Sequence, residues 1–224
     1  MITIRDGVKT YHSGAGTVQA LRGVSLDIPR RDFVAIMGPS GSGKSTLLNV
    51  LGCLDMLDTG RYLLDDEDLV AADTRTLAQV RNRKFGFVFQ MFNLIPRLTA
   101  LRNVELPMIY GQVPASERRS RARRALEQVG LADRCNHSPA QLSGGQQQRV
   151  AIARAIVNEP EIIIADEPTG SLDSRSSEDI MALFHDLHAQ EKTIIMVTHE
   201  NDVAAHAQRL IRLRDGQLLE DSAL

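Results

Sequence analysis

The sequence predicts an α/β fold with a mostly parallel β-sheet, and three observations support this class. Short apolar runs rich in β-branched residues alternate along the chain with segments of helical periodicity. Hydrophobic residues make up 43% of the sequence and charged residues 24%, as in chains that fold in water. A length of 224 residues suits one domain with a single hydrophobic core, into which a further lobe is inserted.

Four apolar runs are expected to form the buried strands of this sheet. They cover residues 33–37, 85–89, 162–165 and 193–197. Runs in which nearly every side chain is apolar are typical of parallel strands that are covered on both faces. We therefore expect these four segments to form the centre of the fold.

Two segments near the end of the chain have a different character. Residues 210–219 predict two short antiparallel strands, because Asp215 and Gly216 can supply the positive φ angles of a tight hairpin. Residues 174–190 predict a helix with a serine-rich start that can cap it. The apolar face of this helix consists of Ile180, Leu183, Phe184 and Leu187.

The stretch from residue 91 to residue 160 has a helical pattern throughout. Thr99 is expected to cap one helix, a polar helix is expected from Ser116, and a further helix is expected over residues 145–157. We interpret residues 91–160 as the inserted lobe. Its polar helix carries an arginine cluster that forms either a solvated face or a contact with lipid headgroups or an acidic partner: Arg118, Arg119, Arg121, Arg123 and Arg124.

Charge and hydropathy restrict the partners of the chain. The 26 basic and 28 acidic side chains give a formal net charge of −2, so no nucleic acid is expected as a partner. The first six residues lack the basic start and the long apolar stretch of a secretory signal, so no export is expected. The longest apolar runs are far shorter than the roughly 18 residues of a membrane-spanning helix. Any membrane contact is therefore expected to be made through a partner protein.

A glycine-rich loop lies between the first predicted buried strand and an apolar helix. Residues 38–45, Gly-Pro-Ser-Gly-Ser-Gly-Lys-Ser, match the phosphate-loop pattern G-x-x-x-x-G-K-[ST] in the position that this pattern requires. Glycines let successive N–H groups point at phosphate oxygens, and the helix start presents its positive dipole end to the same anion. A flexible Gly/Ser linker, the alternative, would not require a lysine there. The expected triphosphate-binding residues are Gly38, Ser40, Gly41, Ser42, Gly43, Lys44, Ser45 and Thr46.

Two carboxylates follow directly after the predicted strand at residues 162–165. The carboxyl ends of strands in such sheets line the ligand crevice. Asp166 is expected to hold Mg²⁺, and Glu167 is expected to orient and polarise the water that attacks the γ-phosphate. A solvated acidic strand end is the alternative, and the phosphate loop in the same chain argues against it.

A second anion-binding turn is predicted at residues 142–149, Leu-Ser-Gly-Gly-Gln-Gln-Gln-Arg, where a helix begins. A Ser-Gly-Gly turn at a helix start can hold an anion, and one chain has no second triphosphate of its own for it. This segment resembles the signature of ABC transporter nucleotide-binding subunits. With Tyr11, Gln90, Asp173 and His199 in the expected order, the resemblance covers essentially the whole chain.

The resemblance implies a P-loop NTPase (RecA-like) fold with antiparallel β elements. Its core would be residues 1–90 and 161–224, with an inserted α-helical subdomain at residues 91–160. The resemblance also implies a head-to-tail homodimer on ATP binding, in which each ATP lies between the phosphate loop of one chain and Ser143 and Gly145 of the other.

The resemblance further implies individual roles. Tyr11 would lie against the adenine ring, and Asp173 would join the two sites across the dimer. The implied catalytic residues are Glu167, His199, Gln90 and Lys44, of which His199 would contact the γ-phosphate. The implied Mg²⁺ ligands are Ser45, Gln90 and Asp166.

Closer matching indicates one branch of the family. Gly52-Cys53-Leu54-Asp55, Pro139-Ala140-Gln141 and residues 166–173 resemble the macrolide-exporter and lipoprotein-releasing (MacB/LolD) proteins. Arg30-Arg31-Asp32 departs from that pattern, because relatives usually have a glycine turn there. The implied function is ATP hydrolysis that drives export by a separate transmembrane permease, with the chain on the inner face of the cell membrane.

Three alternatives differ in what the hydrolysis drives. A regulatory or mechanotransmitting ATPase of the cell-division kind and an importer ATPase have the same motifs, and the sequence does not separate them from an exporter. A DNA-maintenance ATPase would carry long coiled coils between the phosphate loop and the signature, and no sustained heptads occur there. The sequence does not indicate the transported substrate, because such a subunit does not contact it.

Overall fold

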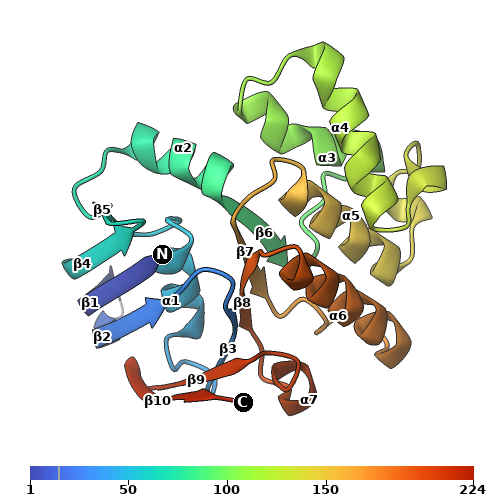
Figure 1. The fold of residues 1–224 in the computed structure, drawn as a ribbon. Coiled ribbons are helices and arrows are strands. Elements are labelled where there is room, and N and C mark those ends of the chain that lie inside the picture. Colours follow the sequence, from blue (N-terminus) through green and yellow to red (C-terminus); the bar gives the residue numbers. More distant parts are fainter. Residues whose placement is uncertain (15) are drawn as a thin grey trace. The chain divides into compact units, whose positions relative to one another are not determined.

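The computed structural model describes residues 1–14 and 16–224, and the chain folds into two compact units. The first unit consists of Met1–Arg81 and Thr193–Leu224, and the second of Asn82–Lys192. Both contain strands and helices (Figure 1), so the α/β class is confirmed. The lobe expected at residues 91–160 lies within the second unit, which also includes a strand before it and a strand and a helix after it. The bounds of that lobe stay a prediction.

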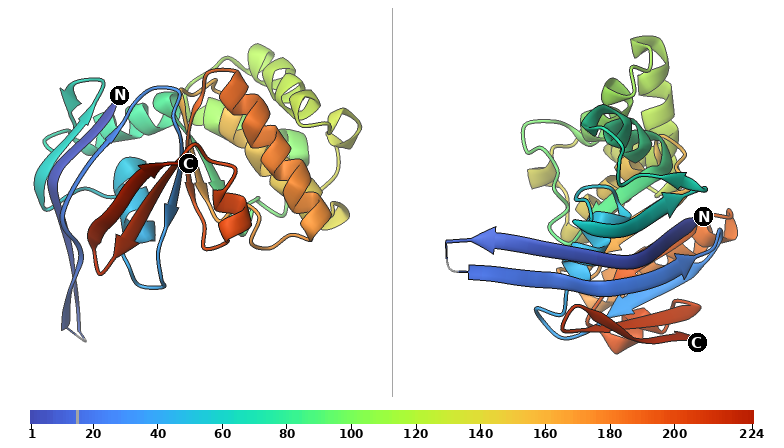
Figure 2. Two further views of the ribbon diagram at one scale, coloured as in Figure 1. Left: turned by 60° about the horizontal axis from the view of Figure 1, so that its bottom comes forward. Right: turned by 90° about the vertical axis from the view of Figure 1, so that its left-hand side faces the viewer.

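The first unit has an antiparallel sheet in the order β2-β1-β4-β5. Its strands are β1 (Ile2–Ser13), β2 (Gly16–Ile28), β4 (Thr59–Leu64) and β5 (Glu67–Asp68). Figure 2 shows β1 and β2 side by side. At the start of β1, the alternate residues Ile2 and Ile4 face the core. The register between β1 and β2 shifts between Lys9 and Thr10, just before Tyr11.

The other strands of the first unit are mostly parallel. β3 (Phe33–Met37) pairs in parallel with β8 (Thr193–Val197) and with β9 (Arg209–Arg214), and all of β3 and β8 is buried. β10 (Gln217–Ala223) returns antiparallel to β9, and the φ angles of Asp215 and Gly216 between them are 49° and 78°. These findings confirm two of the predicted strands and the predicted hairpin, although its second strand extends beyond residue 219.

The helices of the first unit bury few residues each. α1 (Lys44–Leu51) follows β3 and buries four apolar side chains, Leu47, Leu48, Val50 and Leu51. α2 (Thr74–Lys84) buries only Leu77 and leads along the chain into the second unit. α7 (Asn201–Ala204) is a single turn after β8.

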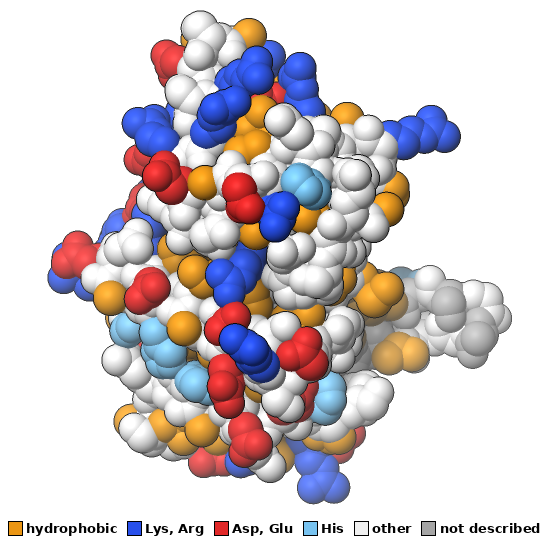
Figure 3. All heavy atoms as spheres, turned by 90° about the vertical axis from the view of Figure 1, so that its right-hand side faces the viewer, with side chains coloured by type: hydrophobic (Ala, Val, Ile, Leu, Met, Phe, Trp, Pro, Cys, Tyr) orange, Lys and Arg blue, Asp and Glu red, His pale blue; other side chains and the backbone are white. Residues whose placement is uncertain are grey.

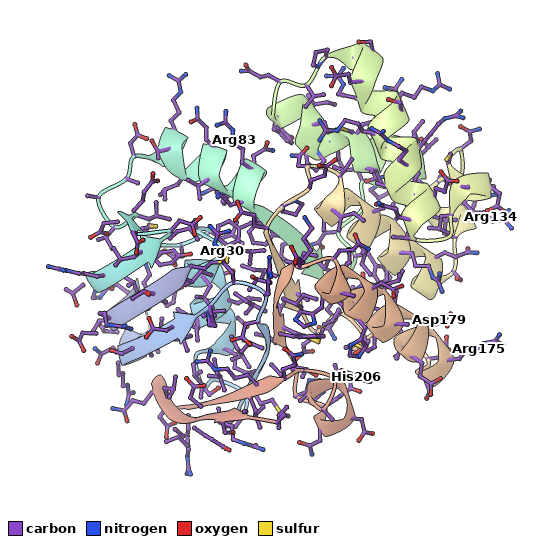
Figure 4. All side chains as sticks on the ribbon, viewed as in Figure 1. Arg30, Arg83, Arg134, Arg175, Asp179 and His206 are labelled. Carbon is purple, nitrogen blue, oxygen red and sulfur yellow. The ribbon has the colours of Figure 1, made fainter. Side chains whose placement is uncertain are left out.

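The turn before β3 forms without a glycine. Arg31 adopts a left-handed backbone with φ 64°, and its N–H donates to Thr193 Oγ1 at 2.9 Å. Arg30, labelled in Figure 4, donates to Asp65 Oδ1 at 2.6 Å. The turn therefore forms although Arg30-Arg31-Asp32 stands where relatives usually have a glycine.

The second unit pairs β6 (Phe85–Phe89) in parallel with β7 (Ile162–Asp166), which confirms the other two predicted strands. Its helices are α3 (Ala100–Tyr110), α4 (Ala115–Gln128), α5 (Gly144–Ile156) and α6 (Ser174–Ala189), with 3-10 turns at Ala132–Arg134 and Pro139–Gln141. α5 contacts α3, α4, α6 and β6, and most of its length is buried. It is therefore the central helix of this unit.

The helix starts agree in part with the predicted ones. Thr99 caps α3 as expected, since its Oγ1 accepts a hydrogen bond from Arg102 N at 3.3 Å. α4 begins at Ala115 and not at Ser116, because Pro114 directly before it has a fixed φ that leads the chain into a helix. No helix within residues 1–14 and 16–224 is long and apolar enough to cross a membrane.

The arginines of α4 form a largely solvated face. Arg118 and Arg121 donate to the backbone carbonyls of Val113 and Val157 at 3.4 and 3.1 Å. The three exposed members of the cluster are Arg119, Arg123 and Arg124. Figure 3 shows basic side chains gathered on this part of the surface.

Candidate active site

The glycine-rich loop connects β3 to α1 in the first unit, where the sequence predicts it. Gly43 caps α1 with φ 101°, and a Cβ there would lie 2.5 Å from the carbonyl oxygen of Ala20. Gly38 has φ 155°, and a Cβ there would overlap the carbonyl oxygen of Leu213. Both positions thus require glycine, because the loop backbone runs against β2 and β9.

The start of α1 keeps its positive end available to an anion. The first turn of the helix contains no acidic side chain. Lys44 Nζ donates to the carbonyl oxygens of Gly38 and Pro39 at 2.8 and 2.9 Å, so its charge lies over the loop. Ser45 is exposed next to it. Ser42 Oγ is buried and has no hydrogen-bond partner among the described residues.

Two further predicted residues belong to the first unit. His199 follows β8, which pairs in parallel with β3, so His199 and the phosphate loop lie at the same edge of the sheet. Tyr11 lies on β1 with 40% of its surface exposed, and its hydroxyl donates to Asp55 Oδ2 at 2.7 Å.

Asp166 and Glu167 are at the end of β7 in the second unit. Asp166 is the last residue of the strand, and both carboxylates are half-buried. Glu167 has φ 45°, which turns the chain sharply and sends the two side chains in different directions. The turn closes with a hydrogen bond from Gly170 N to Glu167 O at 3.1 Å.

Gln90, which follows β6, lies close to this turn. A Cβ on Gly170 would be 2.7 Å from Gln90 Nε2 and 3.4 Å from Glu167 Oε2. The amide of Gln90 and the carboxylate of Glu167 therefore border the same space at Gly170, and a side chain on Gly170 would fill it. The structure thus brings together two residues that are far apart in the sequence.

The backbone after Gln90 is held by a side chain of α5. Phe92 and Asn93 have φ angles of 59° and 50°, two consecutive left-handed residues that are not glycine. Arg154 donates to their carbonyl oxygens at 2.9 and 2.6 Å. Burial lowers the pKa of the Arg154 guanidinium, and these two carbonyls compensate part of that cost.

Two other buried amides organise the same region. Gln148 of α5 donates through Nε2 to Pro168 O at 2.6 Å and more weakly to Phe89 O at 3.4 Å, on the two sides of the Gln90–Glu167 pair. Asn103 of α3 accepts from Ile95 N at 2.7 Å and donates to three backbone carbonyls between Ile95 and Thr99. Sequence reasoning missed Arg154, Gln148 and Asn103, and the available signal was a polar residue within an apolar helical stretch.

The signature turn forms the capped start of α5. Ser143 Oγ accepts from Gln146 N at 3.3 Å, and Gln146 Oε1 accepts from Ser143 N at 3.1 Å, which makes a capping box. The first turn contains no acidic side chain. A Cβ on Gly145 would lie 2.9 Å from Ser176 Oγ, so the glycine allows close contact with the start of α6.

Asp173 caps α6, which corrects the expectation of a serine cap. Its Oδ1 accepts from Ser176 N at 2.9 Å and its Oδ2 from Ser176 Oγ at 2.8 Å. The hydrogen bonds from Ser176 lower the pKa of Asp173, so this exposed residue keeps its charge at neutral pH. Ser176 thereby lies between Asp173 and Gly145. A further link from α5 to α6 runs from Arg149 to Asp179 at 2.8 Å (Asp179 is labelled in Figure 4).

A phosphate loop between a buried parallel strand and a helix defines a P-loop nucleotide-binding protein. The sequence model of the ABC transporter family matches residues 21–170. The chain belongs to this family, as one of its ATP-binding domains. The resemblance inferred from the motifs is thereby confirmed.

Several relatives are similar over nearly the whole chain. An uncharacterized ABC transporter ATP-binding protein of Bacillus subtilis, YvrO, is 56% identical over 221 residues, which cover 99% of this chain and 96% of YvrO. The macrolide export ATP-binding/permease protein MacB of Brucella melitensis is 56% identical over 222 residues. That match covers 99% of this chain and 34% of MacB, so the chain spans about a third of that protein.

The fold is also that of a solved relative. The dimeric, post-hydrolysis structure of the ATP-binding cassette MJ0796 bound to ADP and Pi has a TM-score of 0.91 and 48% sequence identity. The comparison covers 100% of this chain and 99% of the MJ0796 chain. It confirms the P-loop NTPase fold class predicted from the sequence.

Proposed function

We propose that this chain is the ATP-hydrolysing subunit of an ABC transporter and converts ATP and water to ADP and phosphate. The phosphate loop carries the proposal. Its two space-restricted glycines, Gly38 and Gly43, bring backbone N–H groups to the start of α1, where Lys44 adds a positive charge. Such a loop supplies the positioning and electrostatic stabilisation on which phosphoryl transfer depends.

The other predicted site residues have separate roles in the proposal. Glu167 orients and polarises the attacking water as general base, and Gln90 helps to hold that water. Their common position at Gly170 supports a joint role. His199 contacts the γ-phosphate, and Tyr11 stacks on the adenine ring.

Mg²⁺ fits the oxygen donors that the sequence predicts for it. The hydroxyl of Ser45, the amide oxygen of Gln90 and the carboxylate of Asp166 are hard ligands of the kind that Mg²⁺ prefers. The described residues contain no group of three or more His, Cys, Asp or Glu side chains that could hold a metal. Such a ligand set suits an ion that takes most of its coordination from phosphate oxygens and water. When bound, it neutralises negative charge on the phosphates.

The proposed working form is a head-to-tail homodimer, in which Ser143 and Gly145 contact the ATP of the partner. The dimeric state of MJ0796 supports this. Asp173 is exposed, as a contact across the dimer requires.

We further propose a separate transmembrane permease, which holds the chain at the inner face of the membrane and carries out export. MacB of B. melitensis, an export ATP-binding/permease protein, supports this assignment. YvrO, which is matched over 96% of its length, is named as an ABC transporter ATP-binding protein. Met91 and Ile95 are 73% and 43% exposed after Gln90, and these apolar side chains suit a permease contact.

The proposal is tested by Glu167→Gln. The amide keeps the shape of the side chain but cannot act as a base, so turnover should fall by about two to four orders of magnitude while ATP still binds. ATP should then trap a dimer, which size-exclusion chromatography with Mg-ATP detects. Glu127→Gln alters an exposed carboxylate of the same unit and is the control. Wild-type turnover in Glu167→Gln, or a variant that binds ATP but stays monomeric, would contradict the proposal.

A further inference from the structure

A charged cluster in the first unit holds the side chain of Tyr11. The Tyr11 hydroxyl donates to Asp55 Oδ2 at 2.7 Å, and Asp55 Oδ1 accepts from Lys9 Nζ at 2.7 Å. The same Oδ1 accepts from Met56 N at 2.7 Å, which fixes the orientation of the carboxylate. Asp55 thus uses both oxygens to join β1 to the segment that follows α1.

Lys9 and Asp58 reinforce this connection. Lys9 Nζ also donates to Met56 O at 2.8 Å and lies 3.5 Å from Asp58 Oδ1. Asp58 Oδ2 accepts from Thr10 N at 2.6 Å. Three consecutive residues of β1 are therefore bound to residues 55–58, at the place where the register of β1 shifts.

The cluster also determines which face of the Tyr11 ring is open. Lys9 Nζ lies over the ring, 5.4 Å from its centroid, in a cation–π arrangement. The Lys9 side chain is only 13% exposed, so it is held in that position. Tyr11 as a whole residue is 40% exposed, and with Lys9 over one face of the ring, the opposite face is the one that a base can stack on.

The protonation states suit this geometry at neutral pH. Burial alone would raise the pKa of Asp55, but hydrogen bonds from Lys9 and Tyr11 keep it below its usual value. Burial and the hydrogen bond to Asp55 raise the pKa of Tyr11. Asp55 is therefore an acceptor and the Tyr11 hydroxyl a donor.

We propose that Asp55 is a positioning residue of the adenine site, which holds the Tyr11 ring in the orientation that a bound base needs. The role rests on the proposed function, in which Tyr11 stacks on adenine. A ring that is already held does not have to be ordered when the base binds, and that ordering costs affinity. Asp55 therefore contributes to binding of the nucleoside part of ATP without touching it.

The test compares ATP with inorganic triphosphate, which has no base. In calorimetric titrations of the full chain, Asp55→Ala should raise the Kd for ATP about 3- to 10-fold and leave the Kd for triphosphate unchanged. Tyr11→Phe, which removes only the hydroxyl, should have the same effect. The double variant should be no worse than either single variant, because both remove one interaction.

Two variants serve as controls for a merely structural effect. Asp27 accepts hydrogen bonds from Arg5 and Thr3 on the same sheet, so Asp27→Ala removes a carboxylate with similar bonds at a more exposed position and should change neither Kd. Asp55→Asn keeps an acceptor oxygen for Tyr11 and should retain most of the ATP affinity. If Asp55→Ala is unstable, Tyr11→Phe tests the same interaction.

The outcomes separate this role from the proposed function. Equal losses for ATP and triphosphate in Asp55→Ala, or an unchanged Kd for ATP, would overturn the role of Asp55. Lys44→Ala should weaken both ligands. If Lys44→Ala binds both as tightly as the wild type does, the assignment of the phosphate loop fails, whatever the Asp55 variants show.

Discussion

The backbone angle of Glu167 sets the directions of two neighbouring side chains. Its φ of 45° separates the directions of Asp166 and Glu167, at a cost for a non-glycine residue of about 1–2 kcal/mol. The sequence predicts both carboxylates but not this angle, because a residue before proline normally favours extended backbone. Pro168 and Thr169 are buried directly after it, so packing holds a conformation that local preference disfavours.

Gln112 allows the cost of left-handed backbone to be measured away from the candidate site. It follows Gly111, the C-cap of α3, with φ 57° and an exposed side chain. Gln112→Gly should raise the free energy of unfolding by about 0.5–1 kcal/mol, because glycine adopts this angle without steric strain. Gln112→Ala keeps the Cβ and should give no such gain. Denaturant unfolding of both variants decides the matter, and equal stabilities would contradict the prediction.

At the scale of elements, the signature helix α5 connects several parts of the candidate site. Ser143 caps its start, Gln148 donates to carbonyls before Gln90 and after Glu167, and Arg154 donates to carbonyls after Gln90. One helix thus fixes the backbone on both sides of Gln90. A displacement of the loop that begins at Gln90 would therefore alter the hydrogen bonds that α5 makes to it.

The contribution of Arg154 can be measured by hydrogen exchange. In Arg154→Lys a single ammonium replaces the planar guanidinium that reaches two carbonyls. The backbone around Phe92 and Asn93 should therefore unfold locally more often. Amide exchange over residues 90–99 should rise about tenfold, equivalent to about 1.4 kcal/mol. Arg149→Lys is the matched control, because Arg149 lies on the same helix and donates to Val129 and Asp179. Equal exchange over residues 90–99 in the two variants would contradict the role of Arg154.

Elements with a regular apolar pattern could be predicted from the sequence, and others could not. The four buried strands follow from runs of apolar residues, and α5 differs from its expected span by one residue at each end. α2 was missed because it buries only Leu77, which gives no apolar periodicity to detect. Asn103 and Arg154 stand out in the sequence only as polar residues within apolar helical stretches. Which backbone carbonyls they reach could not be predicted, since that depends on which segments pack together.

At the scale of the whole molecule, the proposed function uses residues of both units. The first unit contains the phosphate loop, Tyr11 and His199, and the second contains Gln90, Glu167 and the signature turn. The phosphate loop, Glu167 and the signature turn are local patterns with a chemical reason of their own, whereas Tyr11, Gln90 and His199 are indicated only by the resemblance to the family. The match to dimeric MJ0796 over 100% of this chain supports their joint action in a dimer. The signature turn is the part whose role depends most on that dimer.

Ser143→Arg tests this role. If Ser143 and Gly145 contact the ATP of a partner, the variant should bind ATP as a monomer nearly as well as the wild type, because its own phosphates are held by the loop of the first unit. ATP-dependent dimerisation should fail, since the arginine side chain fills space that the bare turn leaves for a phosphate. Ser138→Arg is the matched control, because Ser138 also forms a capping box, at the 3-10 turn Pro139–Gln141. Size-exclusion chromatography with Mg-ATP reports dimerisation, and thermal unfolding checks that losing the cap of α5 leaves the chain folded.

Mixing two inactive variants then shows which chain completes which site. A dimer of one Ser143→Arg chain and one Lys44→Ala chain can combine an intact phosphate loop with an intact signature at only one of its two sites, while the other site carries both changes. ATP should therefore restore some dimer on mixing, although neither variant dimerises alone. Coupling between the sites could still suppress turnover, so dimerisation and not hydrolysis is the quantity to measure. Loss of ATP binding by the folded Ser143→Arg monomer would assign the signature to the chain's own site, and the head-to-tail dimer would then be wrong.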